Sequence, residues 1–360
     1  MAAIAKSVVN ECLRARPGEA ISISTYPHTI ELANEIAAEC YRADAEPLLL
    51  LDTDEFFYDQ FKLLTEEQLR RPSPHCLGLA DYVTASIWLG GPKDPKGMQR
   101  VPASKWTAYY EGEDPHYNKM LEKKTRSVGL SLGSVTRERA RTYGFNYAAW
   151  KRSVEDGLKV KYADLQRIGK IVGALLSLPQ KVQVTAPNGT DLRFRLETRK
   201  AHVNDGIIDD EDIAAGNTSV NLPAGDVSIA PEEISARGTI VGDVPIPLQG
   251  KLVEGLAFTF ADGRVTQIDG KRNAKLVQDG FAGGTGDKDR LASLTVGLNP
   301  KLRPGFLTSS LARGVVTVGI GDNRGLGGTN KASWGFYASV ANATLTVGGK
   351  TIVDGGKLVL

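Results

Sequence analysis

The sequence predicts an α/β protein in which a parallel α/β domain over residues 1–178 precedes a β-rich domain over residues 179–360. The chain has 360 residues, and a typical domain has about 100–200. Helix-like and strand-like segments alternate in the first half, whereas short alternating strands follow one another in the second. Glycine is unevenly distributed too, with 12 of the 39 glycines in residues 1–175 and 27 in residues 176–360.

The first half predicts a parallel sheet covered by helices. Residues 20–24 form a short apolar strand, and residues 29–43 carry apolar positions at the spacing of an amphipathic helix. The apolar runs at 46–51 and 82–89 have strand length. Apolar strands separated by helices indicate a parallel sheet that is covered on both faces. Residues 135–177 are expected to be largely helical, ending before a proline.

The second half predicts antiparallel strands. The segments 181–186 and 191–197 alternate in polarity and are joined by a turn containing Asn188-Gly189, which favours a tight hairpin. The same pattern recurs at 256–268 and 344–353. Alternating strands at these intervals indicate a mainly antiparallel β domain.

Composition and charge exclude several classes of protein. The 44 Lys and Arg balance 42 Asp and Glu to a net charge of +2, so nucleic-acid binding is not expected. No apolar stretch approaches the roughly 20 residues of a membrane span, and the N-terminal residues read as a helix rather than a signal peptide. Three cysteines without CxxC spacing, at Cys12, Cys40 and Cys76, indicate reduced thiols. We therefore expect a cytoplasmic protein without a membrane partner.

Nucleotide-binding motifs are absent. The first strand-to-helix turn, residues 24–29, has no glycine, although a backbone that closely approaches a pyrophosphate needs them. The glycine-rich segments 280–286 and 319–330 lack the Gly-Lys-Ser/Thr of a phosphate-binding loop. We interpret both segments as turns between strands.

Residue chemistry alone leaves the site open. The only histidines, His28, His75, His116 and His202, include no pair at helical ligand spacing. The segment 202–212 gathers His202 with five carboxylates, which is compatible with a divalent cation site but equally with a solvated acidic loop. A Ser-His-Asp arrangement stays open too, although no G-x-S-x-G turn is present.

Several segments in order resemble the M29 family of thermophilic-type metallo-aminopeptidases. The matching stretches cover nearly the whole chain, and the one at 220–233, with its NLPxGxVxxAP pattern, is the most specific. The others are residues 16–51, 188–194, 297–300, 314–330 and 353–360. The resemblance implies an N-terminal α/β domain, a β-rich C-terminal domain, a homodimer, and two divalent ions such as zinc or cobalt in the C-terminal domain.

The resemblance also implies where the metal ligands, two glutamates, two histidines and an aspartate, would lie. The first glutamate falls on Asp226, the second on Ser293 and the first histidine on Thr317. The family's final His-Trp-Asp triplet appears here as Ser333-Trp334-Gly335. One carboxylate thus remains of five ligands, whereas catalytic zinc keeps three protein ligands and an open position.

The sequence therefore predicts a protein that acts without a metal or another cofactor on a small organic molecule, with amide or related hydrolysis favoured. Its candidate catalytic residues are Asp226, Ser293, Thr317, Ser333 and His202, the only histidine of the second half. Two alternatives stay open: a metal-dependent leucyl-type aminopeptidase, as in the family, and a non-catalytic ligand-binding or regulatory homodimer. Ring opening of hydroxylated pyridines with iron and dioxygen, known among the family's relatives, would require histidines that positions 317 and 333 lack.

Overall fold

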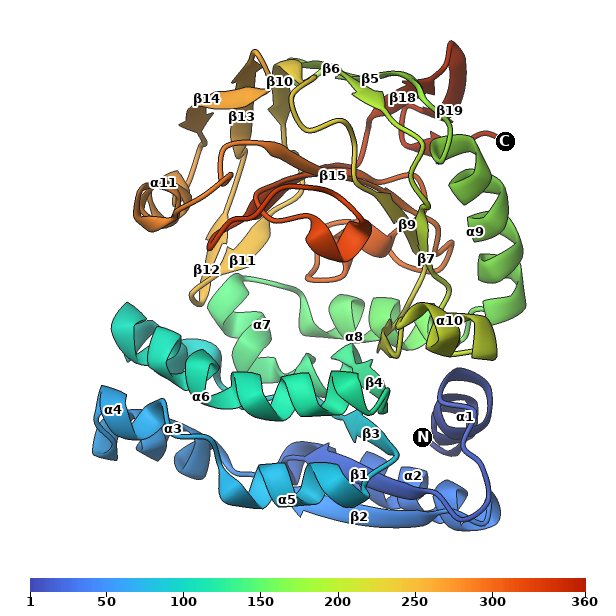
Figure 1. The fold of residues 1–360 in the computed structure, drawn as a ribbon, viewed down its shortest axis with the longest axis vertical. Helices are drawn as coiled ribbons and strands as arrows, with labels where there is room; N and C mark the ends of the chain where they lie inside the picture. Colours follow the sequence, from blue (N-terminus) through green and yellow to red (C-terminus); the bar gives the residue numbers. More distant parts are fainter. The chain divides into compact units, whose positions relative to one another are not determined.

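The computed structural model describes residues 1–360, apart from the side chain of Ala103. The chain divides into two compact units, coloured along the sequence in Figure 1. The first unit comprises Met1–Leu158 and Gly206–Pro223, and the second comprises Lys159–Asp205 and Ala224–Leu360. The two units are interleaved in the sequence. Helix α9 lies before the predicted boundary at residue 178 but packs on strands of the second unit. Strand β8 lies after that boundary but pairs with β4 of the first unit.

The first unit contains the predicted parallel sheet. Its strand order is β2-β1-β3-β4-β8, and every neighbouring pair is parallel. The strands are β1 (Ala20–Thr25), β2 (Glu46–Leu51), β3 (Ala85–Trp88), β4 (Arg126–Leu130) and β8 (Ser219–Leu222). Strand β8 comes from the second half of the sequence and nevertheless joins this sheet. Its Val220 lies in register with Val128 of β4.

Helices accompany this sheet, as the alternation of segments predicts. Helix α2 packs on β1 and β2 through a buried stripe that includes Leu32, Ile36 and Cys40. The helical elements of the unit are α1 (Ala2–Lys6), η1 (Ser7–Cys12), η2 (Pro27–Thr29), α2 (Ile30–Arg42), α3 (Asp54–Leu63), α4 (Glu66–Leu69), α5 (Pro74–Tyr82), η3 (Pro95–Arg100), α6 (Ala103–Glu122), η4 (Ser131–Ser134), α7 (Arg137–Tyr143), α8 (Tyr147–Gly157) and α10 (Asp210–Ala215).

Two details of the first unit differ from the sequence-based expectation. Strand β2 lies at the edge of the sheet and exposes Leu48 and Leu51, because only β1 pairs with it. The apolar run at 82–89 begins as helix rather than strand, since Tyr82 is the last residue of α5 and β3 starts at Ala85. Among the described residues, no helix is long and apolar enough to cross a membrane.

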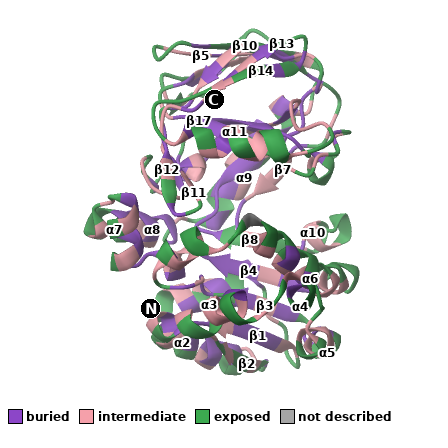
Figure 2. Ribbon diagram, turned by 90° about the vertical axis from the view of Figure 1, so that its left-hand side faces the viewer, coloured by how far each residue is buried: buried purple, intermediate pink, exposed green. Residues whose placement is uncertain are grey.

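The second unit is built from antiparallel sheets. The larger sheet has the order β14-β13-β10-β6-β5-β18-β19-β20 and the smaller the order β17-β16-β15-β9-β7. Figures 1 and 2 show them as two layers, and Figure 2 marks buried residues on their strands in purple. The predicted hairpins are present as β5–β6, β13–β14 and β18–β19.

The elements of the second unit have the following bounds. The larger sheet contains β5 (Gln180–Ala186), β6 (Thr190–Leu196), β10 (Arg237–Val241), β13 (Ala257–Ala261), β14 (Arg264–Asp269), β18 (Thr344–Val347), β19 (Lys350–Asp354) and β20 (Lys357–Leu358). The smaller contains β7 (His202–Asn204), β9 (Asp226–Ile229), β15 (Leu291–Gly297), β16 (Val316–Ile320) and β17 (Phe336–Val340). A separate pair is β11 (Ile246–Leu248) with β12 (Lys251–Val253), and the helical elements are α9 (Tyr162–Leu176), α11 (Ala274–Gly283), η5 (Ser309–Leu311) and η6 (Arg324–Leu326).

The glycine-rich segment 280–286 is not a turn between strands. Its first four residues end helix α11, which packs near β14. Gly280 is required there because a Cβ at that position would lie 2.4 Å from Nε1 of Trp334. The prediction missed this because a bulky indole, not a turn, selects the glycine.

The acidic part of the segment 202–212 forms the start of α10. Asp209 caps this helix by accepting a hydrogen bond from the backbone N–H of Asp212 at 3.0 Å, and Asp210 pairs with Arg16 at 2.7 Å. Carboxylates in the first turn are favourable because they face the positive end of the helix dipole. The charge run therefore has a structural explanation as a helix start.

Candidate functional site

One face of the five-stranded sheet carries a row of polar side chains. Antiparallel pairing places His202 of β7 opposite Ser228 of β9, and Ser228 opposite Thr295 of β15. Thr295 in turn lies opposite Thr317 of β16, and Thr317 opposite Ser339 of β17. Residues directly opposite each other project to the same face of a sheet. We call these five residues the polar row.

The other face of the same sheet is apolar. Val227, Leu294 and Val318 are fully buried. Each is the sequence neighbour of a polar-row residue on its strand, β9, β15 or β16 respectively. Successive side chains alternate between the two faces of a strand, so this register directs the valines and leucines to the core. A shift by one residue would exchange the polar and apolar side chains between the two faces, so burial of the apolar face fixes the position of the polar row.

Hydrogen bonds connect neighbouring members of the polar row. Oγ of Ser228 lies 2.8 Å from Oγ1 of Thr295, and Oγ1 of Thr317 lies 2.8 Å from Oγ of Ser339. Thr317 and Ser339 are buried, with 6% and 1% of their surface exposed. Each hydroxyl can donate one proton and accept others, so the row is able to reorient its donors.

Asp226 lies on the same face as the polar row, because it is two residues before Ser228 on β9. It is 8% exposed, and its carboxylate accepts hydrogen bonds from Nδ2 of Asn204 at 2.8 Å and from Oγ of Ser228 at 3.1 Å. Burial raises the pKa of the Asp226 carboxyl, against the opposing effect of the two hydrogen bonds and of nearby His202. The raised pKa makes Asp226 a stronger base and a weaker acid than an ordinary aspartate.

An unpartnered acceptor lies beside this carboxyl. Asn204 pairs with Asp226 across β7 and β9, and its Nδ2 is used by that carboxylate. Its Oδ1 is buried and accepts no hydrogen bond among the described residues. A buried polar atom without a partner costs free energy, of about 1–3 kcal/mol, unless a ligand satisfies it.

The structure brings together four of the five predicted site residues. Asp226, Thr317 and His202 share the polar face, and Ser293 lies two residues before Thr295 on β15, opposite Gly319. A Cβ on Gly319 would lie 2.5 Å from Oγ of Ser293, so this hydroxyl covers the glycine. These residues form one surface although they come from four strands.

Ser333 has a different role. It is exposed and precedes β17, where its Oγ accepts hydrogen bonds from N of Thr285 at 2.9 Å and from Oγ1 of Thr285 at 3.0 Å. The adjoining Trp334 stacks on Phe336, with ring centroids 6.1 Å apart and an interplanar angle of 8°. Ser333 therefore joins the end of α11 to β17 rather than the polar row.

Sequence reasoning missed Asn204, Ser228, Thr295 and Ser339 as members of this surface. The signal was the alternation of small polar residues with valine, leucine or alanine in β9, β15, β16 and β17. That alternation identifies a two-faced strand, but only the register shows that the polar positions meet.

The loop after β15 closes over the end of the site. A Cβ on Gly297 would lie 2.1 Å from the carbonyl oxygen of Ala312, so the backbone passes directly over this glycine, which is opposite Asp226. Asn299 follows and donates from Nδ2 to the carbonyl oxygen of Ala224 at 2.8 Å. The Gly-Leu-Asn-Pro segment thus anchors the turn before Asp226.

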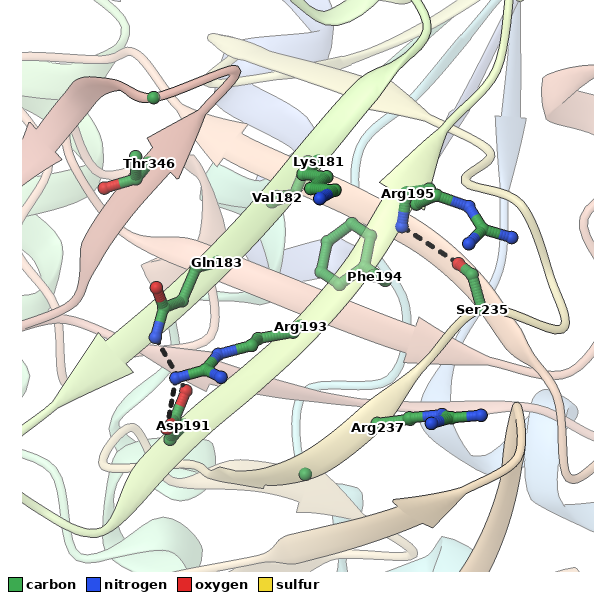
Figure 3. Close-up of a pocket in the computed structure, with 12 residues that line it drawn as sticks. Lys181, Val182, Gln183, Asp191, Arg193, Phe194, Arg195, Ser235, Arg237 and Thr346 are labelled. Atoms are coloured by element: carbon green, nitrogen blue, oxygen red, sulfur yellow. Dashed lines mark hydrogen bonds and ion pairs between the residues drawn. The ribbon is translucent and has the colours of Figure 1, made fainter.

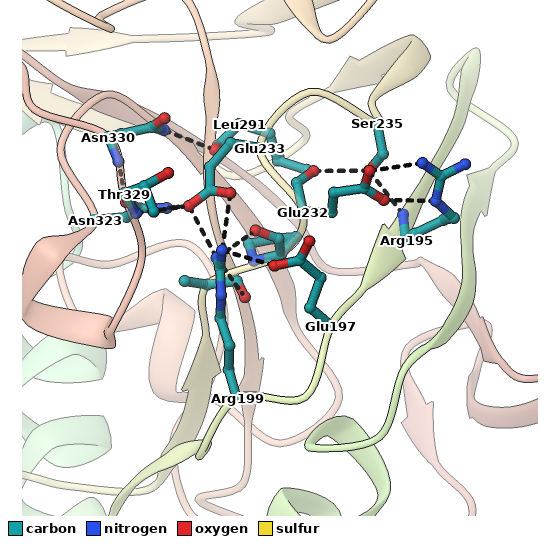
Figure 4. A network of polar contacts seen from close by, with 12 residues as sticks. Arg195, Glu197, Arg199, Glu232, Glu233, Ser235, Leu291, Asn323, Thr329 and Asn330 are labelled. Carbon is teal, nitrogen blue, oxygen red and sulfur yellow. Dashed lines mark hydrogen bonds and ion pairs between the residues drawn. The ribbon is translucent and has the colours of Figure 1, made fainter.

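A buried ion pair supports the strand that carries Asp226. Figure 4 shows Glu233, after β9, between Arg199 and the loop before β17. Its carboxylate accepts bonds from Nη1 and Nη2 of Arg199 at 2.8 and 3.0 Å, from Nδ2 of Asn323 at 3.0 Å and from N of Thr329 at 2.8 Å. Burial alone would raise the pKa of Glu233, but these donors outweigh it and lower the pKa to about 2.

The same network explains the second glycine-rich segment. Asn330 donates from Nδ2 to the carbonyl oxygens of Leu291 and Gly321, and its N–H donates to Oδ1 of Asn323. Residues 319–330 thus connect β16 to β17, as predicted, through a loop that the Glu233 carboxylate holds in place. This loop is structural, and it borders the five-stranded sheet on which the polar row lies.

Residues 165–288 match the family model of the thermophilic metalloproteases, M29. The predicted family resemblance is confirmed. No curated protein sequence matches the chain significantly.

Two solved structures share the M29-like fold. Wild-type AmpT from Thermus thermophilus has a TM-score of 0.75 at 17% identity, covering 100% of this chain and 98% of that one. The 2,5-dihydroxypyridine dioxygenase from Pseudomonas putida KT2440 has a TM-score of 0.63 at 14% identity, covering 99% and 96%. At these identities the likeness establishes the fold, an α/β unit followed by a β-rich unit.

The residues at the positions given by the M29 resemblance do not fit a pair of divalent ions. Asp226 is the only carboxylate among Asp226, Ser293, Thr317 and Ser333, and it already accepts two hydrogen bonds. Neutral hydroxyls are poor ligands for zinc, which binds thiolate, imidazole and carboxylate groups. Among the described residues, no group of three or more His, Cys, Asp or Glu is arranged to hold a metal ion.

Proposed function

We propose that this protein hydrolyses a small organic amide at the polar row without a paired-metal centre, and that Asp226 is its acid–base residue. One observation supports this most strongly. A buried carboxyl with a raised pKa lies next to Oδ1 of Asn204, a buried acceptor without a partner. An acceptor of this kind suits the N–H of an amide substrate.

The proposed reaction uses only groups of this chain. The substrate N–H donates to Oδ1 of Asn204, and the carbonyl oxygen accepts a hydrogen bond from the hydroxyl of Thr295, while the hydroxyl of Ser228 keeps donating to Asp226. The Asp226 carboxylate removes a proton from a water molecule as that water attacks the carbonyl carbon. The protonated carboxyl then donates this proton to the leaving nitrogen as the C–N bond breaks.

Electrostatics support Asp226 in both roles. An ordinary aspartate is too weak a base and too strong an acid for efficient proton exchange near neutral pH, and burial raises its pKa toward that range. His202 lies across the strand pair from Ser228 and interacts electrostatically with Asp226. We assign His202 and Thr317 to substrate positioning, and Ser293 to the rim of the same surface.

Non-catalytic ligand binding is the second candidate. It is favoured by the mutual hydrogen bonds of Ser228 with Thr295 and of Thr317 with Ser339, which satisfy these hydroxyls without a reaction. Both candidates use the same surface and differ in whether Asp226 transfers a proton. The expected homodimer and the cytoplasmic location stay predictions.

The test is turnover of a panel of aminoacyl-p-nitroanilides and p-nitrophenyl esters by the full-length chain in the presence of a chelator. We expect Asp226→Asn to lower kcat by about 100-fold or more, the usual contribution of a general base. The matched control is Asp262→Asn, because the Asp262 side chain is 88% exposed.

The outcomes separate the candidates. Turnover that persists with the chelator and is lost only in Asp226→Asn supports hydrolysis by this carboxyl. Binding of a panel member without turnover in the unmodified chain favours the ligand-binding protein. Turnover that requires added zinc, cobalt or manganese and is unaffected by Asp226→Asn contradicts the proposal.

A further inference from the structure

The larger sheet of the second unit has a hollow on its solvent-facing side. It has a volume of about 720 Å³ and is lined by residues of β5, β6, β10 and β18 together with the turn after β18 (Figure 3). This volume lies within the range of about 300–1,000 Å³ that is typical of small-molecule sites. The hollow is formed by the eight-stranded sheet, whereas the polar row lies on the five-stranded sheet.

Strand register concentrates positive charge in this hollow. Lys181 of β5 lies opposite Arg195 of β6, and Arg193 of β6 lies opposite Arg237 of β10. Lys181, Arg193, Arg195 and Arg237 are all exposed and all line the hollow. Asp191 is the single carboxylate among the lining residues. Four cations against one anion contrast with a net charge of +2 for the whole chain.

The cations differ in how far they are already neutralised. Arg195 forms a two-pronged pair with Glu232, at 2.5 and 2.6 Å. Arg193 makes a single longer contact of 3.2 Å with Asp191, whose other oxygen accepts from Nε2 of Gln183 at 2.9 Å.

Two further cations are even less neutralised than Arg193. Lys181 forms no ion pair among the described residues. Arg237 contacts Asp262 at 3.2 Å, and both of these side chains are more than three-quarters exposed. An exposed pair of this kind contributes about 0–1 kcal/mol, so a ligand can replace it at little cost. Lys181, Arg193 and Arg237 thus present unused or weakly used donors to one volume.

We propose that this hollow binds a small molecule carrying two or more phosphate groups. Guanidinium groups match phosphate oxygens with paired hydrogen bonds, and Arg193 and Arg237 lie side by side on neighbouring strands. Lys181 adds a point charge two positions along β5 from Gln183. Gln183 and Ser235 supply neutral polar groups at the wall. The inference is independent of the hydrolytic function proposed for the polar row.

The experiment is isothermal titration calorimetry of the full-length chain with inorganic tripolyphosphate, and with citrate as a carboxylate of similar charge. We expect tripolyphosphate to bind with an affinity that falls as sodium chloride is added, because exposed charges are screened by salt. Lys181→Gln and Arg193→Gln are each expected to weaken binding by about tenfold, as the loss of one charge-assisted contact does. The matched control is Lys251→Gln, which removes one exposed charge from β12.

Binding that weakens in the two hollow variants and not in Lys251→Gln supports the site. Tighter binding of tripolyphosphate than of citrate supports phosphate as its ligand group, and the reverse order overturns that assignment. The site itself is overturned if tripolyphosphate does not bind at low ionic strength, or if all three variants weaken binding equally. Thermal unfolding of each variant confirms that lost binding is not lost folding.

Discussion

Replacement of Glu233 by glutamine tests the ion pair that holds the strands of the second unit together. Glu233 is 6% exposed and accepts four hydrogen bonds, two of them from Arg199. Its pKa is lowered from 4.5 to about 2. This difference corresponds to about 3 kcal/mol of stability at neutral pH. Arg199 keeps a second carboxylate partner, Glu197 at 2.8 Å, so removing the Glu233 charge does not leave it unpaired and the expected loss stays near this value.

The sign of the pH dependence follows from the lowered pKa. The stabilisation is fully present above the unfolded value of 4.5 and is lost as the pH falls toward about 2, where the folded protein also binds the proton. At pH 3 the remaining contribution is about 1 kcal/mol. The difference between Glu233→Gln and the unmodified protein is therefore expected to shrink on acidification.

Differential scanning calorimetry of the full-length chain measures this effect. At neutral pH we expect Glu233→Gln to lower Tm by about 6–12 °C, since 1 kcal/mol shifts Tm by about 2–4 °C for a unit of this size. The neighbouring Glu232→Gln is the control, because Glu232 pairs with the half-exposed Arg195 at the surface. An equal loss of Tm in both variants, or a loss from Glu233→Gln that is the same at pH 3 as at pH 7, would refute the reasoning.

Three further predictions follow from the site and its sheet. Asp226→Asn is expected to raise Tm at pH 7, because the raised pKa of Asp226 means that its ionisation above 3.8 costs stability. Equal Tm values of the variant and the unmodified protein over the whole pH range would contradict this. Thr317→Val is expected to lower the free energy of unfolding in urea by about 1–3 kcal/mol, because it leaves the Ser339 hydroxyl without its partner. Adding Ser339→Ala is expected to recover part of this loss, and strictly additive losses would argue against the pair. Gly297→Ala is expected to lower the free energy of unfolding by about 3 kcal/mol, because its Cβ would lie 2.1 Å from the carbonyl oxygen of Ala312. No loss in urea unfolding would show that the loop moves away from the added Cβ, contrary to this prediction.

Much of the fold could be predicted from the sequence because its signals are local. The helix at Ile30–Arg42 follows from a repeat of 3.6 residues, and the hairpin of β5 and β6 follows from alternation around Asn188-Gly189. Strand β8 could not be predicted in the parallel sheet, because its pairing partner β4 lies about 90 residues earlier in the chain. Local polarity does not specify which distant strand is its neighbour.

The candidate site shows the same limit. The family resemblance indicated Asp226, Ser293 and Thr317, and cross-strand register places all three on one face. Asn204 and Ser228 contact Asp226 directly, yet nothing in their local sequence distinguishes them from other small polar residues. These contacts with Asp226 can be predicted only once the register of the neighbouring strands is known.

The positively charged hollow of the larger sheet could not be predicted from the sequence either. The overall charge balance gave no reason to expect an anion site, since positive and negative residues are nearly equal in number. Lys181, Arg193 and Arg237 are separated by up to 56 positions and meet only because β5, β6 and β10 are adjacent in the sheet. Pairing of strands, rather than clustering in sequence, produces this charge.

Metal analysis of the purified full-length chain, combined with turnover of aminoacyl-p-nitroanilides before and after chelation, tests the central claim most directly. If Asp226 and the polar row do the chemistry, the chain carries far less than one divalent ion per molecule and turnover is unchanged by the chelator. Two ions per chain, with turnover that disappears on chelation and returns with zinc or cobalt, would contradict the account.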